Sequence, residues 1–414
     1  MAKLNVILVS GSRHTIPPNK KSPGVPRIIE TLSSNDSTSF KYKVISKYDD
    51  SLKQQDYNKS KFLHVAPTLS SHFFEMILHY VPLSIRKRVF GYVLPDRIVY
   101  YEGIKRLIRK EKPDIIITFM HFELFKKLHK AYPKAKHIYF FRSTDLKLRL
   151  GDENIDYLLK NSCGFLANTR SPVEELKLIS PYLKFPIETI YNAINLDDFT
   201  CKISQEHSYK YRNGLNLTPQ DFVIGYAGRL SEEKSILELL EAVNYLKNKG
   251  ITVHLCIAGS IQNESTPNKS YYDNIIDFVQ THIAKQVHFM GWLSNDNLFE
   301  FYNAIDISVL LSKYSEGNSM FLLESLSMGV PVITTRIGGN IEMISNGQNG
   351  FLINTENIKE NLIDQLELVL NDRTQLTAMS IKAIKFIKQN HTNDVMINKF
   401  NKFMKNFCEK TYNQ

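Results

Sequence analysis

The sequence predicts an α/β protein built from two doubly wound parallel-sheet domains. The chain has 414 residues, of which 43% are hydrophobic, and this is enough for two sizeable cores. Short apolar runs of β-prone residues alternate with longer amphipathic stretches, and the pattern occurs once in each half of the chain. Consecutive strand–helix units of this kind require parallel strands joined by right-handed crossovers.

The first half of the chain carries five predicted strands with helical stretches between them. Each strand is a short run of mostly apolar residues, in most cases rich in β-branched or aromatic side chains. The predicted strands are Asn5–Val9, Tyr42–Ile45, Ile115–Thr118, His137–Phe141 and Gly164–Ala167. After the first strand, the segment Gly24-Val25-Pro26-Arg27 opens a helix that continues through Ile28, Ile29 and Leu32.

The same pattern begins again in the second half. A helix over Ile236–Leu246 follows the first of these strands. The predicted strands are Phe222–Ala227, Val253–Ala258, Val287–Met290, Ile305–Leu310 and Pro331–Thr334.

Two breaks in the pattern suggest the domain boundaries. The segment Asn192–Ser208 has no apolar periodicity and is the predicted hinge. After about residue 390, the spacing of Phe400, Phe403 and Phe407 predicts a terminal amphipathic helix. We therefore predict domains at 1–198 and 199–389, followed by a helix at 390–414.

Composition excludes several classes of protein. Charged residues make up 23% of the chain and aromatic residues 11%, as in ordinary folded proteins. Met1–Ser10 is too short for a signal peptide, and no run of eighteen apolar residues occurs. The four cysteines show no Cys-x-x-Cys spacing, so we expect reduced thiols and a cytoplasmic location. No His-Glu-x-x-His motif or His/Cys cluster predicts a bound metal. The cysteines are Cys163, Cys201, Cys256 and Cys408.

The net excess of positive charge lies entirely in the first 200 residues. Residues 1–200 hold 32 Lys and Arg against 20 Asp and Glu, a net charge of +12, and the remainder has −2. The basic cluster Arg86-Lys87-Arg88 follows the apolar segment Phe73–Tyr80, which predicts contact with an anionic membrane surface near residues 73–112. No nucleic-acid recognition motif accompanies the charge, so a nucleic-acid partner is not expected.

The most informative motif is a loop with one acid that opens a helix with a second acid. Glu316 precedes the small residues Gly317, Asn318 and Ser319, and Glu324 follows eight positions after Glu316. The free N–H groups of such a helix start, together with the helix dipole, suit a phosphate. The second carboxylate is placed to accept hydrogen bonds from vicinal hydroxyls, as acids do with ribose. The motif predicts a nucleotide-diphosphate pocket with an extra acid at its reactive end.

These residues resemble the retaining nucleotide-sugar glycosyltransferases of family 4, which have the GT-B fold with two Rossmann-like domains. The likeness is specific from about residue 190 to 355. It implies that the terminal helix crosses back to the first domain. The matching segments are 192–195 with Phe199, 228–234, 316–324, 329–333 and 338–339.

The resemblance also implies a role for each residue of the motif. Glu316 is expected beside the donor sugar, and Arg229 and Lys234 are expected to neutralise the leaving diphosphate without a metal cofactor. The amides from Gly317 to Met320 would hold the distal phosphate and Glu324 the ribose. The remaining expected donor contacts are Gly24, Gly228, Gly291 and Trp292.

The first domain is expected to bind the acceptor. Relatives place a histidine after the strand that corresponds to His137–Phe141, but this chain has Arg142 there. Either Arg142 or His121 is expected to take that place.

The expected activity is transfer of a sugar from a nucleotide-diphospho-sugar, UDP-sugar favoured over GDP-sugar, to a glycan, lipid-linked glycan or glycoprotein. Two alternatives remain open. One is a catalytically silent glycosyltransferase-like subunit that binds glycan or a partner protein. The other is a GT-B sugar-nucleotide epimerase, a class that lacks this two-acid motif.

Overall fold

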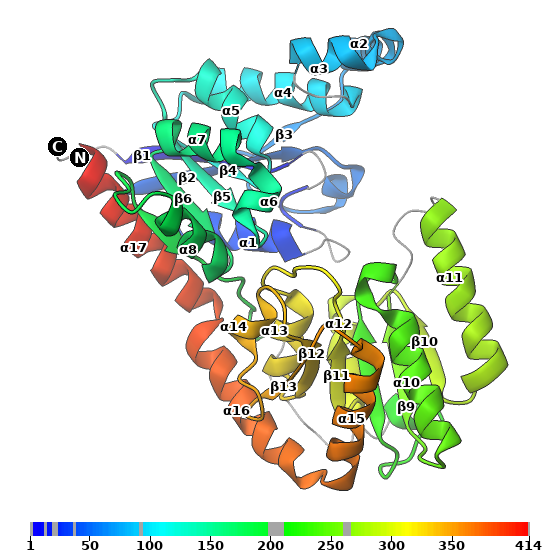
Figure 1. Ribbon diagram of the computed structural model, residues 1–414. Helices are drawn as coiled ribbons and strands as arrows, with labels where there is room; N and C mark the ends of the chain where they lie inside the picture. Colours follow the sequence, from blue (N-terminus) through cyan, green and yellow to red (C-terminus); the bar gives the residue numbers. More distant parts are fainter. Residues whose placement is uncertain are drawn as a thin grey trace. The chain divides into compact units, whose positions relative to one another are not determined.

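The computed structural model describes residues 3–11, 15–18, 24–35, 39–90, 94–197, 211–259 and 266–412 (Figure 1). The predicted boundary at 198/199, most of the predicted hinge, Phe199 and Cys201 lie outside the described residues. The chain divides into two compact units. Unit 1 comprises Met1–Ile190 with Met396–Gln414, and unit 2 comprises Tyr191–Val395.

Unit 1 is a seven-stranded parallel sheet with the order β3-β2-β1-β4-β5-β6-β7. Its apolar strands are buried on both faces, as expected of a parallel sheet covered by helices. The strands are β1 Leu4–Val9, β2 Phe40–Lys47, β3 Phe62–Val65, β4 Ile115–Phe119, β5 Lys136–Phe141, β6 Gly164–Ala167 and β7 Ile187–Thr189.

The helices of unit 1 connect these strands and cover the sheet (Figure 1). One group, α2 to α4, forms a long excursion between β3 and β4. The helices are α1 Gly24–Ser34, η1 Asp50–Gln54, α2 Leu69–Tyr80, α3 Leu83–Phe90, α4 Pro95–Glu111, α5 Phe122–Ala131, α6 Leu146–Leu150, α7 Asp152–Asn161, α8 Arg170–Ile179 and α17 Asn393–Tyr412.

Unit 2 repeats the design with six parallel strands in the order β10-β9-β8-β11-β12-β13. The strands are β8 Val223–Ala227, β9 His254–Ala258, β10 Val287–Gly291, β11 Ile307–Leu310, β12 Val332–Thr335 and β13 Gly350–Ile353. The helices are η2 Glu232–Lys234, α10 Ile236–Asn248, α11 Thr266–Phe278 with the π-helical η3 Val279–Ile283, α12 Asn295–Ala304, α13 Met320–Ser327, α14 Asn340–Met343, α15 Ile358–Asn371 and α16 Thr374–Asn390. The predicted fold class, two doubly wound parallel-sheet domains, is confirmed.

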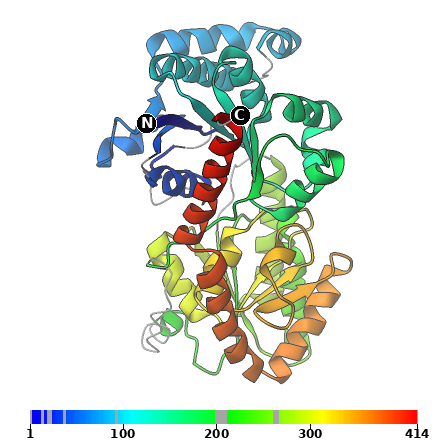
Figure 2. The same cartoon turned by 90° about the vertical axis from the view of Figure 1, so that its left-hand side faces the viewer.

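The last helix, α17, belongs to unit 1 from Met396 onward (Figure 2). Phe400 packs against Tyr42 of β2 with ring centroids 6.0 Å apart. Phe403 lies over Gly164 of β6, where a Cβ would come within 3.0 Å of the Phe403 ring. The helix is therefore part of the first core.

Removing the Phe403 ring should destabilise unit 1. Phe403→Ala is expected to lower the free energy of unfolding by about 3 kcal/mol, since a large buried side chain is lost and a cavity remains. Chemical denaturation of purified protein measures this change. Lys405→Ala on the exposed face of the same helix is the control, with an expected change within about 0.5 kcal/mol. Equal stability of the two variants would contradict the packing of α17 on unit 1.

Among the described residues, no helix combines the length and apolarity needed to cross a bilayer. The described cysteines, Cys163, Cys256 and Cys408, are free thiols.

Candidate active site

A closed polar cluster of three side chains lies at the carboxyl ends of β8 and β11 in unit 2. Lys234 forms an ion pair with Oε1 of Glu316 and donates a hydrogen bond to the Ser312 hydroxyl at 3.3 Å. The Ser312 hydroxyl in turn donates to Glu316 at 2.8 Å. The side chains of Lys234 and Glu316 are only 13% and 20% exposed, so their charges act in a partly desolvated setting. Ligands of open α/β sheets bind at this edge.

The loop after β12 holds Glu316 in place. The N–H of Gly339 donates to the Glu316 carbonyl at 2.7 Å. Gly338 has a φ of +53°, and a Cβ at this position would lie 2.3 Å from the same carbonyl oxygen. Only glycine allows this close approach, which explains the glycine at the first position of the Gly338-Gly339 pair.

Helix α13 starts directly beside this cluster. Ser319 is its N-cap residue, and the Ser319 side chain makes no capping hydrogen bond. The amides of its first turn, beginning at Met320, therefore remain available to an anion, and the helix dipole favours one. Gly317, next to Glu316, adds a further backbone N–H to this stretch.

Asn318 has a different role from its neighbours. Its side-chain oxygen accepts the Asn192 backbone N–H at 2.8 Å, and its carbonyl accepts the Asn192 side-chain amide. The carbonyl oxygen of Asn192 also lies 3.2 Å from Nδ1 of His391. Asn318 thus ties the loop of Glu316 to the segment that begins unit 2.

Glu324 is buried one turn into α13. The Tyr302 hydroxyl from α12 donates to its Oε2 atom at 3.0 Å. Burial, reinforced by the Glu324 charge, raises the pKa of Tyr302 far above its ordinary value, so Tyr302 stays a donor. Tyr302 orients the carboxylate predicted to bind ribose, and its place in the sequence gave no signal of this role.

Arg229 does not join the polar cluster directly. Its guanidinium forms an ion pair with Glu233 at 2.6 Å, and both side chains are about half exposed. Arg229 still acts on Lys234 electrostatically. Burial lowers the pKa of Lys234 to about 8, with Glu233 opposing the shift and Arg229 adding to it.

Three glycines bring the ends of β8, β9 and β10 together. A Cβ on Gly259 would lie 1.9 Å from the carbonyl oxygen of Gly228, and the Gly259 N–H donates to the Gly291 carbonyl at 2.7 Å. Gly228 and Gly291 are predicted donor contacts. Gly259 directly follows a predicted strand, and the sequence alone does not mark it as their packing partner. Trp292, next to Gly291, is 46% exposed.

The remaining predicted residues belong to unit 1. Gly24 opens α1, His121 precedes α5 at the end of β4, and Arg142 follows β5. A Cβ on Gly11 would lie 2.0 Å from Nε2 of His121, so the imidazole covers the end of β1. The Arg142 guanidinium lies over the Phe140 ring at 5.5 Å, and burial lowers its pKa to about 10. His121 and Arg142 thus share the carboxyl edge of the first sheet.

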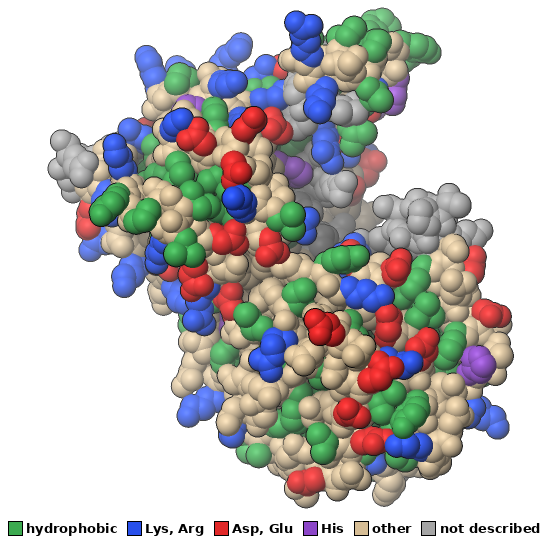
Figure 3. All heavy atoms as spheres, viewed as in Figure 1, with side chains coloured by type: hydrophobic (Ala, Val, Ile, Leu, Met, Phe, Trp, Pro, Cys, Tyr) green, Lys and Arg blue, Asp and Glu red, His purple; other side chains and the backbone are tan. Residues whose placement is uncertain are grey.

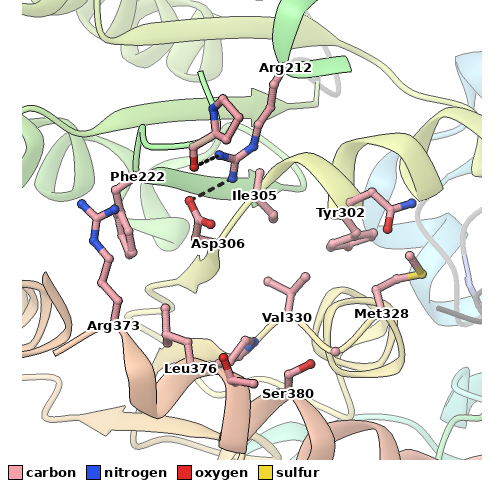
Figure 4. Close-up of a pocket in the computed structure, with 15 residues that line it drawn as sticks. Arg212, Phe222, Tyr302, Ile305, Asp306, Met328, Val330, Arg373, Leu376 and Ser380 are labelled. Carbon is pink, nitrogen blue, oxygen red and sulfur yellow. Dashed lines mark hydrogen bonds and ion pairs between the residues drawn. The ribbon is translucent and has the colours of Figure 1, made fainter. Parts of the chain in front are cut away.

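A separate pocket of about 750 Å³ lies at the opposite edge of the unit 2 sheet (Figure 4). Arg212 and Asp306 line it side by side and pair at 3.0 Å, and Arg373 stacks over the Phe222 ring at 4.9 Å. These residues precede or flank the amino ends of β8 and β11. Tyr302, which also lines this pocket, links it to the predicted site through Glu324.

No group of three or more His, Cys, Asp or Glu side chains in the described part of the chain is arranged to hold a metal ion.

Comparisons with known proteins relate the chain to glycosyltransferases. Residues 208–386 match the family model described as glycosyl transferases group 1. The capsular polysaccharide biosynthesis glycosyltransferase CapM of Staphylococcus aureus is 30% identical over 165 residues, which are 40% of this chain and 40% of CapM. Less than half of that relative's length is therefore matched. The lipopolysaccharide 1,2-N-acetylglucosaminetransferase of Salmonella typhimurium is 26% identical over 342 residues, covering 80% of this chain and 84% of the relative.

The solved structures show the fold. Anabaena Alr3699/HepE, crystallised with UDP and glucose, superposes with a TM-score of 0.72 at 14% identity and covers 97% of this chain and 99% of its own. The two units, each built on a parallel sheet, therefore have the GT-B fold. More narrowly, the chain is similar to the glycosyltransferases of family 4, since residues 208–386 match the group 1 model and both relatives are glycosyltransferases.

Proposed function

We propose that this protein is a retaining glycosyltransferase that transfers a sugar from a nucleotide-diphospho-sugar to a glycan or lipid-linked glycan. The observation that carries the proposal is the Lys234–Ser312–Glu316 cluster beside the uncapped start of α13. It places a cation, a carboxylate and free amides at one point, which is the combination that departure of a diphosphate from a sugar requires.

The chemistry follows from how charge moves in this reaction. As the sugar–phosphate bond breaks, negative charge grows on the diphosphate while the sugar becomes oxocarbenium-like. Lys234 has three N–H donors, so it can pair with Glu316 and still donate to a phosphate oxygen. The amides from Gly317 to Met320 would hold the distal phosphate. Glu316 would accept hydrogen bonds from the sugar hydroxyls and stabilise the positive charge.

The donor is proposed to be a UDP-sugar. Glu324, oriented by Tyr302, would accept hydrogen bonds from the ribose hydroxyls. The base would lie beside the Gly228–Gly259–Gly291 backbone and Trp292. The HepE neighbour was crystallised with UDP and UDP-glucose, which supports uridine over guanosine. The capsule and lipopolysaccharide relatives favour a glycan or lipid-linked acceptor over a glycoprotein.

A screen of UDP- and GDP-sugars for nucleotide release tests the proposal, with and without acceptor glycans and in the presence of EDTA. We expect release from one UDP-sugar that persists in EDTA, because fixed cations replace a metal here. Failure to release nucleotide from any donor would instead favour the silent glycan-binding subunit. Arg142, where relatives have a histidine, keeps that alternative open.

The pKa of Lys234 predicts a pH dependence. Lys234 is protonated below about pH 8 and loses its proton above it. Because only the charged form attracts the diphosphate, kcat/KM for the donor should fall up to about tenfold per pH unit above that value. Initial rates at limiting donor concentration, measured from about pH 6.5 to about pH 9.5, give this profile. The range covers both sides of the Lys234 pKa of about 8.

Lys234→Arg is the matched variant for this profile, since arginine stays charged throughout the range. Its UDP affinity, measured by calorimetry at the same pH values, should not fall in alkaline solution. A wild-type profile that stays flat, or an identical alkaline loss in Lys234→Arg, would assign the ionisation to another group.

A further inference from the structure

The outer face of α2 and α3 in unit 1 is unusually apolar. Of the 21 large hydrophobic side chains that are exposed among the described residues, nine lie between residues 69 and 94. The most exposed are Leu69 at 92%, Tyr80 at 86%, Val89 at 65% and Phe73 at 61%. We define the α2–α3 surface as the exposed face of Leu69–Tyr80 and Leu83–Phe90. Apolar clustering on this scale marks an interaction site.

This surface is additional to the packing that holds the helices on the protein. Helix α2 already packs against α4 through Leu78 and Phe74, which join the core of unit 1. Arg86 is the one buried residue that the structure describes in α3. Figure 1 shows α2 and α3 beyond α4, on the side away from the sheet of unit 1. The exposed apolar side chains therefore face outward.

Basic residues accompany the apolar ones. Lys87 and Arg88 are exposed beside Leu83 and Val89, and Glu75 is the only acidic residue between positions 57 and 95. Figure 3 shows hydrophobic and basic side chains together over these helices. Apolar side chains that enter a headgroup region beside lysine and arginine are the combination that binds an anionic bilayer. An exposed tyrosine such as Tyr80 suits the same interface.

The charge also argues against a second copy of this chain as the occupant. A two-fold symmetric interface places the same patch on both partners. Lys87 and Arg88 would then face their own copies, and this like-charge contact is unfavourable.

We propose that the α2–α3 surface docks unit 1 on an anionic lipid bilayer. The apolar side chains enter the headgroup region, and Lys87 and Arg88 contact the lipid phosphates. This surface differs from the sequence-based expectation of residues 73–112, because it begins at Leu69 and does not include α4. Arg86 is buried, and Lys105 of α4 is paired with Glu102 at 2.7 Å. Neither belongs to the docking surface.

Vesicle co-sedimentation of the full chain tests the proposal without using transfer activity, so its outcome is independent of the proposed function. The probes are vesicles of phosphatidylcholine with phosphatidylglycerol, and vesicles of phosphatidylcholine alone. We expect the protein to bind the anionic vesicles, and added salt should weaken this binding. Binding to the neutral vesicles should be weaker. The pairs Phe73→Ser with Val89→Ser, and Lys87→Glu with Arg88→Glu, should each lower the partition coefficient by at least about tenfold.

Matched control pairs come from another exposed part of unit 1. Leu178→Ser with Tyr182→Ser, and Lys177→Glu with Lys184→Glu, make the same chemical changes at exposed positions near the end of α8. They should bind within about twofold of wild type, since they lie outside the docking surface. Circular dichroism checks that all variants fold.

Three results would overturn the proposal. These are absence of wild-type binding to the anionic vesicles, equal losses in the control pairs, and unchanged binding in both α2–α3 variants. Self-association of the wild type without lipid, lost in Phe73→Ser with Val89→Ser, would assign the surface to a second copy instead.

Discussion

Glu316→Gln should lower the rate of sugar transfer by about a thousandfold or more while the protein stays folded. Glutamine keeps the shape of the side chain and a carbonyl oxygen to accept the Ser312 hydroxyl. It removes the negative charge that pairs with Lys234 and that would stabilise an oxocarbenium-like sugar. Steady-state kinetics with the active donor measure the loss, and thermal unfolding checks the fold.

Glu238→Gln is the matched control for this variant. Glu238 lies in the same unit and is also paired with a lysine, since its Oε1 is 2.6 Å from Nζ of Lys313. It has no contact with the polar cluster among its described interactions, so its transfer rate should stay close to that of wild type. Wild-type turnover in Glu316→Gln would remove this carboxylate from the reaction.

Lys234→Ala should lower kcat/KM for the donor by about a hundredfold to a thousandfold. The ammonium group is the partly buried cation of the cluster, and under the proposed function its loss would leave the growing diphosphate charge without a fixed positive partner. It also leaves Glu316 without its ion pair, so part of the loss would come from a displaced carboxylate. Kinetics at varied donor concentration, together with UDP affinity by calorimetry, measure the effect.

Two further variants, Arg229→Ala and Lys313→Ala, serve as comparisons for the loss of kcat/KM in Lys234→Ala. Arg229 is half exposed and paired with Glu233, so its removal should cost less than that of Lys234. Lys313 pairs with Glu238 outside the cluster, and its removal should leave transfer unchanged. A larger loss in Arg229→Ala than in Lys234→Ala would exchange the roles of the two cations.

Much of the fold could be predicted from the sequence, because long apolar strands and amphipathic helices alternate strongly. The strands that were not predicted are β3, β7 and β13, each three or four residues long. Such short segments carry no clear periodicity. All three lie at sheet edges, where pairing with the neighbouring strand stabilises them more than the β-propensity of their own residues does.

Only those residues of the candidate site that belong to a sequence motif could be predicted from the sequence. Glu316 and Lys234 come from separate motifs, and the structure brings them into contact. Ser312 and Tyr302 act through hydrogen bonds to residues that are distant in sequence, such as the bond that spans 78 positions between Lys234 and Ser312. No local pattern marks contacts of that kind. Of the four charged residues expected around the donor, Lys234 and Glu316 are in contact. Arg229 pairs with Glu233 instead, and Glu324 accepts a hydrogen bond from Tyr302.

A crystal structure with a bound UDP-sugar tests most directly whether the cluster of Lys234, Ser312 and Glu316 is the donor site. We expect a diphosphate oxygen about 3 Å from Nζ of Lys234 and within hydrogen-bond distance of the first amides of α13, with the sugar hydroxyls against Glu316. A diphosphate bound elsewhere, for example between Arg212 and Arg373 at the opposite edge of the sheet, would contradict the assignment.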